Sequence, residues 1–414
     1  MVYTYQLKTT RIRYIAIFVL VIALILALAG GFGVLWRFFI FLLAIILLSY
    51  LWARLNMRNI DGMAGKINGH CRVGQAIEEN FTVVNKGGLP TSLLEIEEDT
   101  DVPGYKNMVT TILPPRSSHT WRSVISCNRR GRYNAGALTV KVTDPLGIFS
   151  IKRQISVNQR IIVYPDIQEL PYFHMVPRYE PGSSPRRWLA GEISPNAARV
   201  REYTNGDSLR HIHWHSTAHT GTLMVKEFDP DRSNIYCKNV WIFPDMHHSV
   251  RIGKGTDTIE EYIVMIAASL TKKYIDAGKE TGLVTSGERS YLFLPDTGER
   301  QLQNILSTLA RVEAAGNIGI DRLLAAEMGR IETGSVVIVI TSSDNRGIIA
   351  QTRRAVNRGA IVMVILLDSF SFGGKVSAAG IAYALISSGV TVYAVRRGMN
   401  LARALDSRVN AAHA

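Results

Sequence analysis

The spacing of hydrophobic and polar residues differs between the beginning, the middle and the end of the chain. Near the beginning, residues 14–53 contain a single charged residue, Arg37, and consist mostly of Leu, Ile, Val, Phe and Ala. This composition is typical of a membrane-spanning segment. One straight helix of this length would reach about 60 Å, roughly twice the thickness of the hydrocarbon layer, so we expect the segment to fold back on itself.

Glycines lie in the middle of this apolar segment. Gly30, Gly31 and Gly33 permit the backbone of a tight turn, which predicts helices near residues 14–29 and 34–53. Basic residues flank the two outer ends of the pair: Lys8, Arg11, Arg13, Arg54, Arg58 and Lys66. By the positive-inside rule, residues 1–57 are predicted to form a transmembrane hairpin of a multi-pass cell-membrane protein, with both chain ends in the cytoplasm.

A cleaved signal peptide is the alternative for the first apolar helix. The sequence Ala27-Leu28-Ala29 before Gly30 is similar to a small-residue cleavage site. Cleavage there would leave a chain that begins with another apolar span, and it would place unpaired cysteines outside the cell. The hairpin explains the segment better.

The middle of the chain, residues 58–166, has short apolar alternations separated by turn residues such as Asn85-Lys86-Gly87-Gly88. The alternations at 81–84, 93–96, 120–125, 138–142 and 161–164 read as strands. Short strands at regular spacing predict an antiparallel β-sandwich. Cys127 is expected to be a small buried residue rather than a nucleophile, because no His follows it at a recognisable spacing within this domain.

Residues 167–235 are expected to connect this domain to the next one. Five prolines and several glycines between Gln168 and Ala198 predict an extended connector over the surface: Pro171, Pro177, Pro181, Pro185, Pro195 and the glycines near them, such as Gly182. The last domain, residues 236–414, alternates apolar strand runs (240–243, 336–340, 361–367 and 390–395) with helical patterns. This alternation predicts a doubly wound, mostly parallel α/β sheet.

In sheets of this kind, ligands bind beyond the carboxyl ends of the strands. Polar residues follow two of the predicted strands, at 245–249 and at 341–344. Both loops are expected to face one crevice.

Net charge, cysteine spacing and the absence of nucleotide-binding motifs bear on which classes of function are expected. The net charge is +13, but Lys and Arg are scattered instead of forming a block, so no nucleic-acid partner is expected and a mild affinity for anionic surfaces is the most that follows. The three cysteines, Cys71, Cys127 and Cys237, are far apart and odd in number, which predicts neither a disulfide framework nor a zinc motif and favours a reducing compartment. No phosphate-binding or dinucleotide motif occurs, so no ATPase activity, cofactor or small-molecule substrate is expected.

The most specific motif lies between Arg199 and Phe228. Its characteristic residues are Arg201, Glu202, Tyr203, Gly206, Asp207, Arg210, Ile212, His213, Trp214, Lys226 and Glu227. In order and spacing they closely resemble the signature of the bacterial "domain of unknown function fifty-eight" family. The resemblance extends upstream to Arg130-Gly131-Arg132-Tyr133, to residues 144–149 and to Val163-Tyr164-Pro165, so it covers essentially the whole chain.

The resemblance implies a C-terminal domain similar to the von Willebrand factor A domain. Within the motif, Trp214 is expected to be a buried anchor, and the charged residues are expected to satisfy one another and to lock the connector onto the α/β domain. A docking surface for another protein is the alternative function of the motif.

Two groups of residues in the chain have the side chains of a possible metal site. His211, His213 and His215, with His219 nearby, would project to one face of a strand and converge on zinc, but no general base accompanies them. The metal-ion-dependent adhesion site of A-like domains resembles the loops at Asp245 and Ser249, but His247 replaces one expected Ser, and Ser342-Ser343 stand where a distal Asp is expected. A degenerate site without metal is therefore predicted.

Together these features predict a non-enzymatic, membrane-anchored scaffold or assembly factor that acts through protein contacts. Proteins that resemble this chain are associated with MoxR-type AAA+ ATPases, so the resemblance implies such a partner besides the lipid bilayer. Two alternatives stay open, a cation-dependent ligand-binding A-like module and a zinc-dependent hydrolase.

Overall fold

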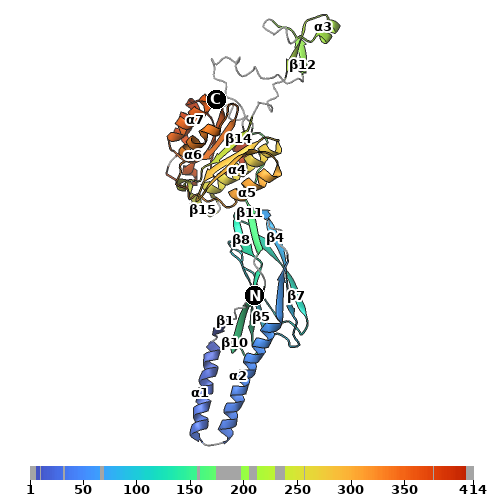
Figure 1. Ribbon diagram of the computed structural model, residues 1–414, viewed down its shortest axis with the longest axis vertical. Helices are drawn as coiled ribbons and strands as arrows, with labels where there is room; N and C mark the ends of the chain where they lie inside the picture. Colours follow the sequence, from blue (N-terminus) through green and yellow to red (C-terminus); the bar gives the residue numbers. More distant parts are fainter. Residues whose placement is uncertain are drawn as a thin grey trace. The chain divides into compact units, whose positions relative to one another are not determined.

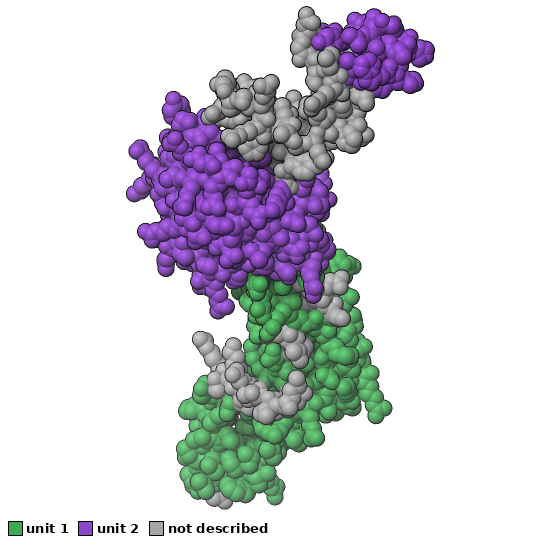
Figure 2. All heavy atoms as spheres, turned by 45° about the horizontal axis from the view of Figure 1, so that its top comes forward, with its two compact units in different colours: residues 1–166, 309–311 green, residues 167–308, 312–414 purple. Residues whose placement is uncertain are grey.

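The computed structural model describes residues 6–9, 11–30, 33–65, 70–155, 159–173, 197–204, 212–228, 238–255, 257–375 and 377–406. The chain forms two compact units, Met1–Asp166 with Leu309–Arg311, and Ile167–Thr308 with Val312–Ala414 (Figure 2).

Two long helices begin the first unit (Figure 1). α1 (Arg11–Gly30) and α2 (Gly33–Asn59) are both long and apolar enough to cross a membrane. Large apolar side chains such as Phe18 and Leu28 are exposed along them. The predicted pair of apolar helices is therefore present, with the first helix ending at Gly30 and the second beginning at Gly33.

The end of α2 lies beyond the predicted position. The helix continues past Ala53 to Asn59, because its last turns pack against a sheet. Ala53 and Met57 are fully buried in one hydrophobic cluster with Phe81 and Val83 of β4 (Ala76–Asn85). The apolar helix and the β-sheets of this unit therefore share a core.

Three β-sheets make up the rest of the described first unit. The first has the strand order β1-β10-β9-β5-β6, the second β2-β4-β7 and the third β3-β11-β8. Their further bounds are β1 Gln6–Thr9, β2 Ile60–Ala64, β3 His70–Arg72, β5 Leu93–Asp99, β6 Met108–Thr111, β7 Ser118–Ser126, β8 Gly131–Ala135, β9 Ala137–Thr143, β10 Phe149–Gln154 and β11 Gln159–Tyr164.

The strands of the first unit alternate between buried and exposed side chains, as their sequence pattern predicts. Two features differ from the prediction. β3 pairs with β11 in parallel, so the strands are not all antiparallel. β1, which precedes the apolar helices, joins β10 as an edge strand that the pattern did not reveal. Both features depend on contacts between distant segments.

A six-stranded mixed sheet lies at the centre of the second unit, in the order β18-β17-β14-β19-β20-β21. All neighbours are parallel except β17 and β18. The bounds are β14 Val240–Pro244, β17 Thr281–Ser286, β18 Ser290–Asp296, β19 Val336–Thr341, β20 Ile361–Leu367 and β21 Thr391–Val395. β14 and β19 are buried along their whole length, as strands covered on both faces require.

Helices connect the strands of this sheet: α4 (Ile259–Asp276), α5 (Gly298–Leu309), α6 (Ile320–Glu327), α7 (Gly347–Asn357) and α8 (Ala379–Ser387). A short helix, α9 (Leu401–Ala404), follows the last strand. Thr258 caps the start of α4, because its hydroxyl accepts a hydrogen bond from the Glu261 amide at 3.3 Å. The strand order reverses at β14, with β17 on one side and β19 on the other. This switch point is where sheets of this class hold ligands.

The segment predicted to be an extended surface connector is partly packed. Leu170 and Phe173 are buried, and the rings of Phe173 and Tyr393 are 5.1 Å apart. Residues 174–196 lie outside the described part of the chain. Further along, β12 (Ala197–Glu202) and β13 (Met224–Phe228) form an antiparallel pair, with α3 (Trp214–Thr220) between them.

Candidate functional site

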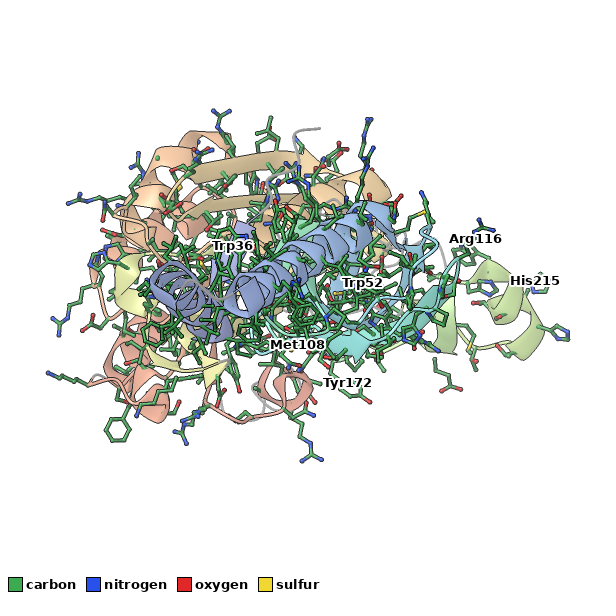
Figure 3. All side chains as sticks on the ribbon, turned by 90° about the horizontal axis from the view of Figure 1, so that it is seen from below. Trp36, Trp52, Met108, Arg116, Tyr172 and His215 are labelled. Carbon is green, nitrogen blue, oxygen red and sulfur yellow. The ribbon has the colours of Figure 1, made fainter. Side chains whose placement is uncertain are left out.

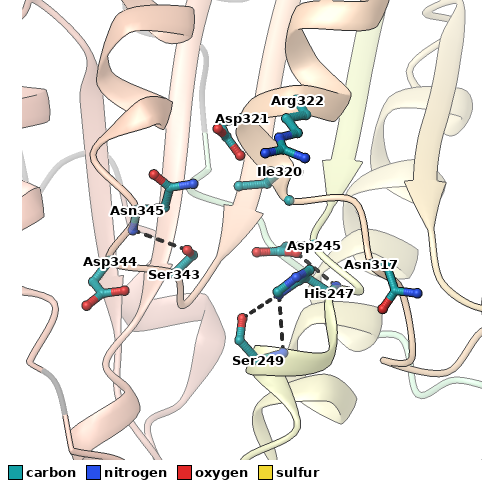
Figure 4. A pocket seen from close by; sticks show the side chains of 11 residues that line it. Asp245, His247, Ser249, Asn317, Ile320, Asp321, Arg322, Ser343, Asp344 and Asn345 are labelled. Atoms are coloured by element: carbon teal, nitrogen blue, oxygen red, sulfur yellow. Dashed lines mark hydrogen bonds between the residues drawn. The ribbon is translucent and has the colours of Figure 1, made fainter.

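A polar pocket of about 390 Å³ opens at the switch point of the six-stranded sheet (Figure 4). It is bordered by the loops that follow β14 and β19 and by the start of α6. Its lining residues are Asp245, His247, Ser249, Asn317, Gly319, Ile320, Asp321, Arg322, Ser343, Asp344 and Asn345. The two loops predicted to share a crevice therefore do meet.

Asp245 is the most buried carboxylate of the pocket, with 2% of its surface exposed. One carboxylate oxygen accepts a hydrogen bond from the Thr341 hydroxyl at 2.6 Å, and the other accepts one from the His247 amide at 3.0 Å. Burial raises the pKa of Asp245, the nearby Asp321 charge raises it further, and the two hydrogen bonds oppose this rise. The carboxylate is thus part of the folded loop, not a free surface group.

His247 is held by its own loop. Its Nδ1 accepts a hydrogen bond from the Ser249 amide at 3.3 Å and lies 2.8 Å from the Ser249 hydroxyl, so it caps the short helical turn His248–Val250. The loop is fastened by Gly316, whose amide donates to Met246 and whose carbonyl accepts from His248, both at 3.0 Å. A Cβ at Gly316 would lie 2.0 Å from the Ser286 carbonyl oxygen, so only glycine permits this approach.

The loop after β19 is ordered by Thr341. Its hydroxyl donates to Asp245 and accepts a hydrogen bond from the Ser343 amide at 2.9 Å. The sequence offers both serines, Ser342 and Ser343, in place of the distal Asp, but only Ser343 lines the pocket.

Asp321 was missed by the sequence reasoning. It lies in the first turn of α6 and faces the same space as Asp245 (Figure 4). Its carboxylate occupies the room left by Gly347, where a Cβ would lie 2.7 Å from one carboxylate oxygen. A Gly-x-Asp sequence at the start of a helix was the available signal, but only the sheet order shows that this helix borders the pocket.

The buried polar groups of the pocket are engaged within their own loops, and its rim is exposed. Within the described residues, no group of three or more His, Cys, Asp or Glu side chains is placed to hold a metal ion. The carboxylate of Asp245 and the ring of His247 are already engaged by neighbours in the loops. Asn317 and Asp344, which line the rim of the pocket, are exposed.

The family motif occupies the β12–α3–β13 segment. Ile212 is buried and pairs with Val225, and Tyr203 donates its amide to the Leu223 carbonyl. Glu202 pairs with Met224 in the register of β12 and β13, which also places the backbones of Arg201, Lys226 and Glu227. Gly206, Asp207 and Arg210 lie outside the described residues.

Trp214 corrects the expectation of a buried anchor. It is the first residue of α3, and 68% of its surface is exposed. The preceding residue, His213, caps the helix by accepting a hydrogen bond from the Ser216 amide at 3.2 Å. The indole is therefore exposed to solvent at the first residue of α3 and is not buried against the helix.

The histidines of the motif do not alternate along a strand. His213 is a helix cap, and His215 and His219 lie in α3, where His215 points outward (Figure 3). His211 lies outside the described residues. The geometry assumed for a zinc site is therefore wrong for the described histidines.

Comparison with known proteins gives three findings. Residues 199–370 match the family described as "Protein of unknown function DUF58". The chain is 27% identical over 201 residues to "Uncharacterized protein YeaD" of Bacillus subtilis (strain 168), covering 49% of this chain and 48% of that protein. The match thus spans about half the length of this curated relative.

Among solved structures, the chain is similar to the CARDB domain of the PF1109 protein from Pyrococcus furiosus, with 14% identity, a TM-score of 0.19 and coverage of 25% of this chain and 86% of that one. It is also similar to proximal thread matrix protein 1 from the mussel byssus, with 14% identity, a TM-score of 0.30 and coverage of 41% and 46%. The family match contains the motif, the switch-point loops and most of the six-stranded sheet, so residues 199–370 of this chain match the DUF58 family of proteins of unknown function.

Proposed function

We propose that this protein is a membrane-anchored scaffold that works through protein contacts and catalyses no reaction. In this proposal α1 and α2 form a transmembrane hairpin with both chain ends in the cytoplasm, and the three sheets of the first unit form a β-sandwich. The second unit is a von Willebrand factor A-like domain. An antiparallel strand at one edge of an otherwise parallel six-stranded sheet supports this last assignment.

The proposal rests on the hydrogen bonds that Asp245 and His247 make within the switch-point pocket. A general base needs a lone pair directed at its substrate. Here Asp245 accepts hydrogen bonds on both oxygens, and the Nδ1 atom of His247 faces Ser249. These contacts hold the shape of the loops and leave an exposed polar rim, which suits recognition of a protein surface.

A MoxR-type AAA+ ATPase is the partner that the family resemblance implies. The pocket rim and the exposed Trp214 are the two surfaces that we assign to partner contacts. Aromatic side chains displayed on a surface are frequent anchors of protein interfaces, because they bury a large area on binding.

In vivo photocrosslinking tests the proposal. A photoreactive amino acid is placed at Asn317 or Asp344, on the rim. The control position is Glu280, which directly precedes β17 and so lies at the amino-terminal ends of the parallel strands, away from the pocket. We expect adducts with an AAA+ ATPase from the two rim positions and none from Glu280, identified by mass spectrometry. Equal adducts at all three positions, or none with any ATPase, would contradict the proposed contact.

A cation-dependent binding module is the second candidate, because Asp245, Asp321 and Asp344 line one pocket. A ligand at a hundred times its dissociation constant stabilises the folded state by about 2.7 kcal/mol. We expect millimolar Mg²⁺ or Mn²⁺ to leave the melting midpoint of the detergent-solubilised chain unchanged. A shift that the Asp245→Asn substitution abolishes would favour this candidate over the metal-free scaffold.

A further inference from the structure

Two cysteines that are distant in the sequence meet inside the first unit. The sulfur atoms of Cys71 and Cys127, 56 positions apart, lie 2.8 Å from each other. Cys71 is 7% exposed and Cys127 is 1% exposed. The sequence predicts no disulfide framework, and both thiols are free in the structure, but the two side chains lie in contact.

The backbone holds the two residues together. Cys71 lies on β3, and the turn that follows β3 is bonded on both sides to Cys127. The Gly74 amide donates to the Cys127 carbonyl, and the Cys127 amide donates to the Gln75 carbonyl, both at 2.9 Å. The surrounding cluster is apolar and includes Ile125 and Val163. Closing the remaining distance to a covalent bond of about 2.05 Å therefore needs a sulfur shift of less than about 1 Å.

We propose that Cys71 and Cys127 are a modification site, at which a peroxide oxidises the two thiols to a disulfide. β3 is the edge strand of the β3-β11-β8 sheet, and β7, which ends just before Cys127, belongs to the β2-β4-β7 sheet. The bond would join two sheets of the first unit. No third residue is needed, because the two sulfur atoms are already in direct contact.

The hydrogen bond between the two thiols indicates which cysteine is oxidised first. The Cys71 thiol donates its hydrogen bond to Cys127, which lowers the pKa of Cys127, and the same bond together with burial raises the pKa of Cys71. Cys127 is therefore the thiol of the pair that ionises more readily, and the proposal assigns it the first step.

The reaction balances with hydrogen peroxide as the oxidant. The Cys127 thiolate attacks one peroxide oxygen, the O–O bond breaks, and the leaving hydroxide takes up a proton to become water. The Cys127 sulfenic acid is then attacked by the Cys71 sulfur, the S–O bond breaks, and the hydroxyl group leaves with the Cys71 proton as a second water. The two sulfurs lose two electrons and the peroxide gains them.

The test uses the detergent-solubilised full chain carrying Cys237→Ser, so that only the pair remains. After treatment with hydrogen peroxide, the chain is unfolded, alkylated and analysed by intact mass and peptide mapping. We expect the chain to lose the mass of two hydrogen atoms, to resist alkylation, and to yield a linked peptide pair containing positions 71 and 127. Reductant should restore both thiols.

A matched variant separates the pair from ordinary thiol oxidation. With Cys71→Ser added, the Ser hydroxyl keeps a hydrogen-bond donor beside Cys127 but offers no second thiol, so we expect Cys127 to gain oxygen and to react with a sulfenic-acid probe. The oxidised pair should also raise the melting midpoint, on the order of 10 °C, because the bond closes a long loop. Two freely alkylated thiols after peroxide, or separate oxidation of each cysteine to an acid, would overturn the proposal.

Discussion

At the residue scale, Glu79 shows how burial changes the chemistry of one side chain. It lies on β4 with 2% of its surface exposed, and neither carboxylate oxygen has a hydrogen-bond partner. Burial, and then the charge of Glu98, raise its pKa to about 8 from a usual value of 4.5. Alternation along β4 predicts an inward-facing position here, but Glu is rarely found at one.

Because the folded-state pKa of Glu79 is raised, the folded protein binds more protons than the unfolded chain between pH 4.5 and about 8. Its contribution to stability is present below the lower value and is lost as pH rises through the upper one. We expect Glu79→Gln to remove this loss and to stabilise the first unit at pH 8.5 by on the order of 2–4 kcal/mol relative to the native chain.

Urea unfolding of the solubilised chain at pH 5 and at alkaline pH measures this effect. Glu78→Gln is the matched control, because Glu78 is the preceding residue and forms an exposed ion pair with Arg122. It should change stability little at either pH. Equal pH dependence of the native chain and Glu79→Gln would contradict the raised pKa.

Trp214 is a second case at this scale. Since the indole is 68% exposed, we expect Trp214→Ala to change the free energy of unfolding by less than about 0.5 kcal/mol, instead of the cost of a buried aromatic. Ile212→Ala is the comparison, because Ile212 is 7% exposed and pairs with Val225. Only Ile212→Ala should speed hydrogen exchange in β12 and β13. Faster exchange with Trp214→Ala would show that the indole is covered.

At the scale of elements, α2 links an apolar helix to the β-sheet core. Met57 is fully buried with Phe81 and Leu94, whereas Leu55, on the same helix, is 39% exposed. We expect Met57→Ala to destabilise the first unit by about 2–5 kcal/mol, and Leu55→Ala to cost less than about 1 kcal/mol. Hydrogen exchange of the β4 amides in the solubilised chain measures both. Similar effects of the two substitutions would mean that Met57 does not pack against the β-sheet.

At the scale of the whole molecule, the proposed topology places everything after α2 in the cytoplasm. In a chain without its native cysteines, single cysteines at Lys86 and Glu280, both exposed, report the side of the membrane. We expect an impermeant maleimide to label neither position in intact cells and both after permeabilisation. Labelling before permeabilisation would reverse the orientation, since charge flanking the helices is its only support.

Several features of this protein follow from its sequence alone. The apolar helix pair, the alternating strands of the first unit and the wholly buried strands β14 and β19 are each determined by the order of neighbouring residues. Hydrophobic periodicity acts over a few residues and needs no distant partner. The family motif is also a local pattern, and the family match includes it.

Only the tertiary structure decided which distant residues meet. Asp321 joins Asp245 because the order of the six strands brings the start of α6 to the end of β14, and Cys71 meets Cys127 because the turn after β3 is bonded to the end of β7. The exposure of Trp214 and the burial of Glu79 likewise depend on what packs against them. Strand order and packing are set by the free energy of the whole core, which no short stretch of sequence contains.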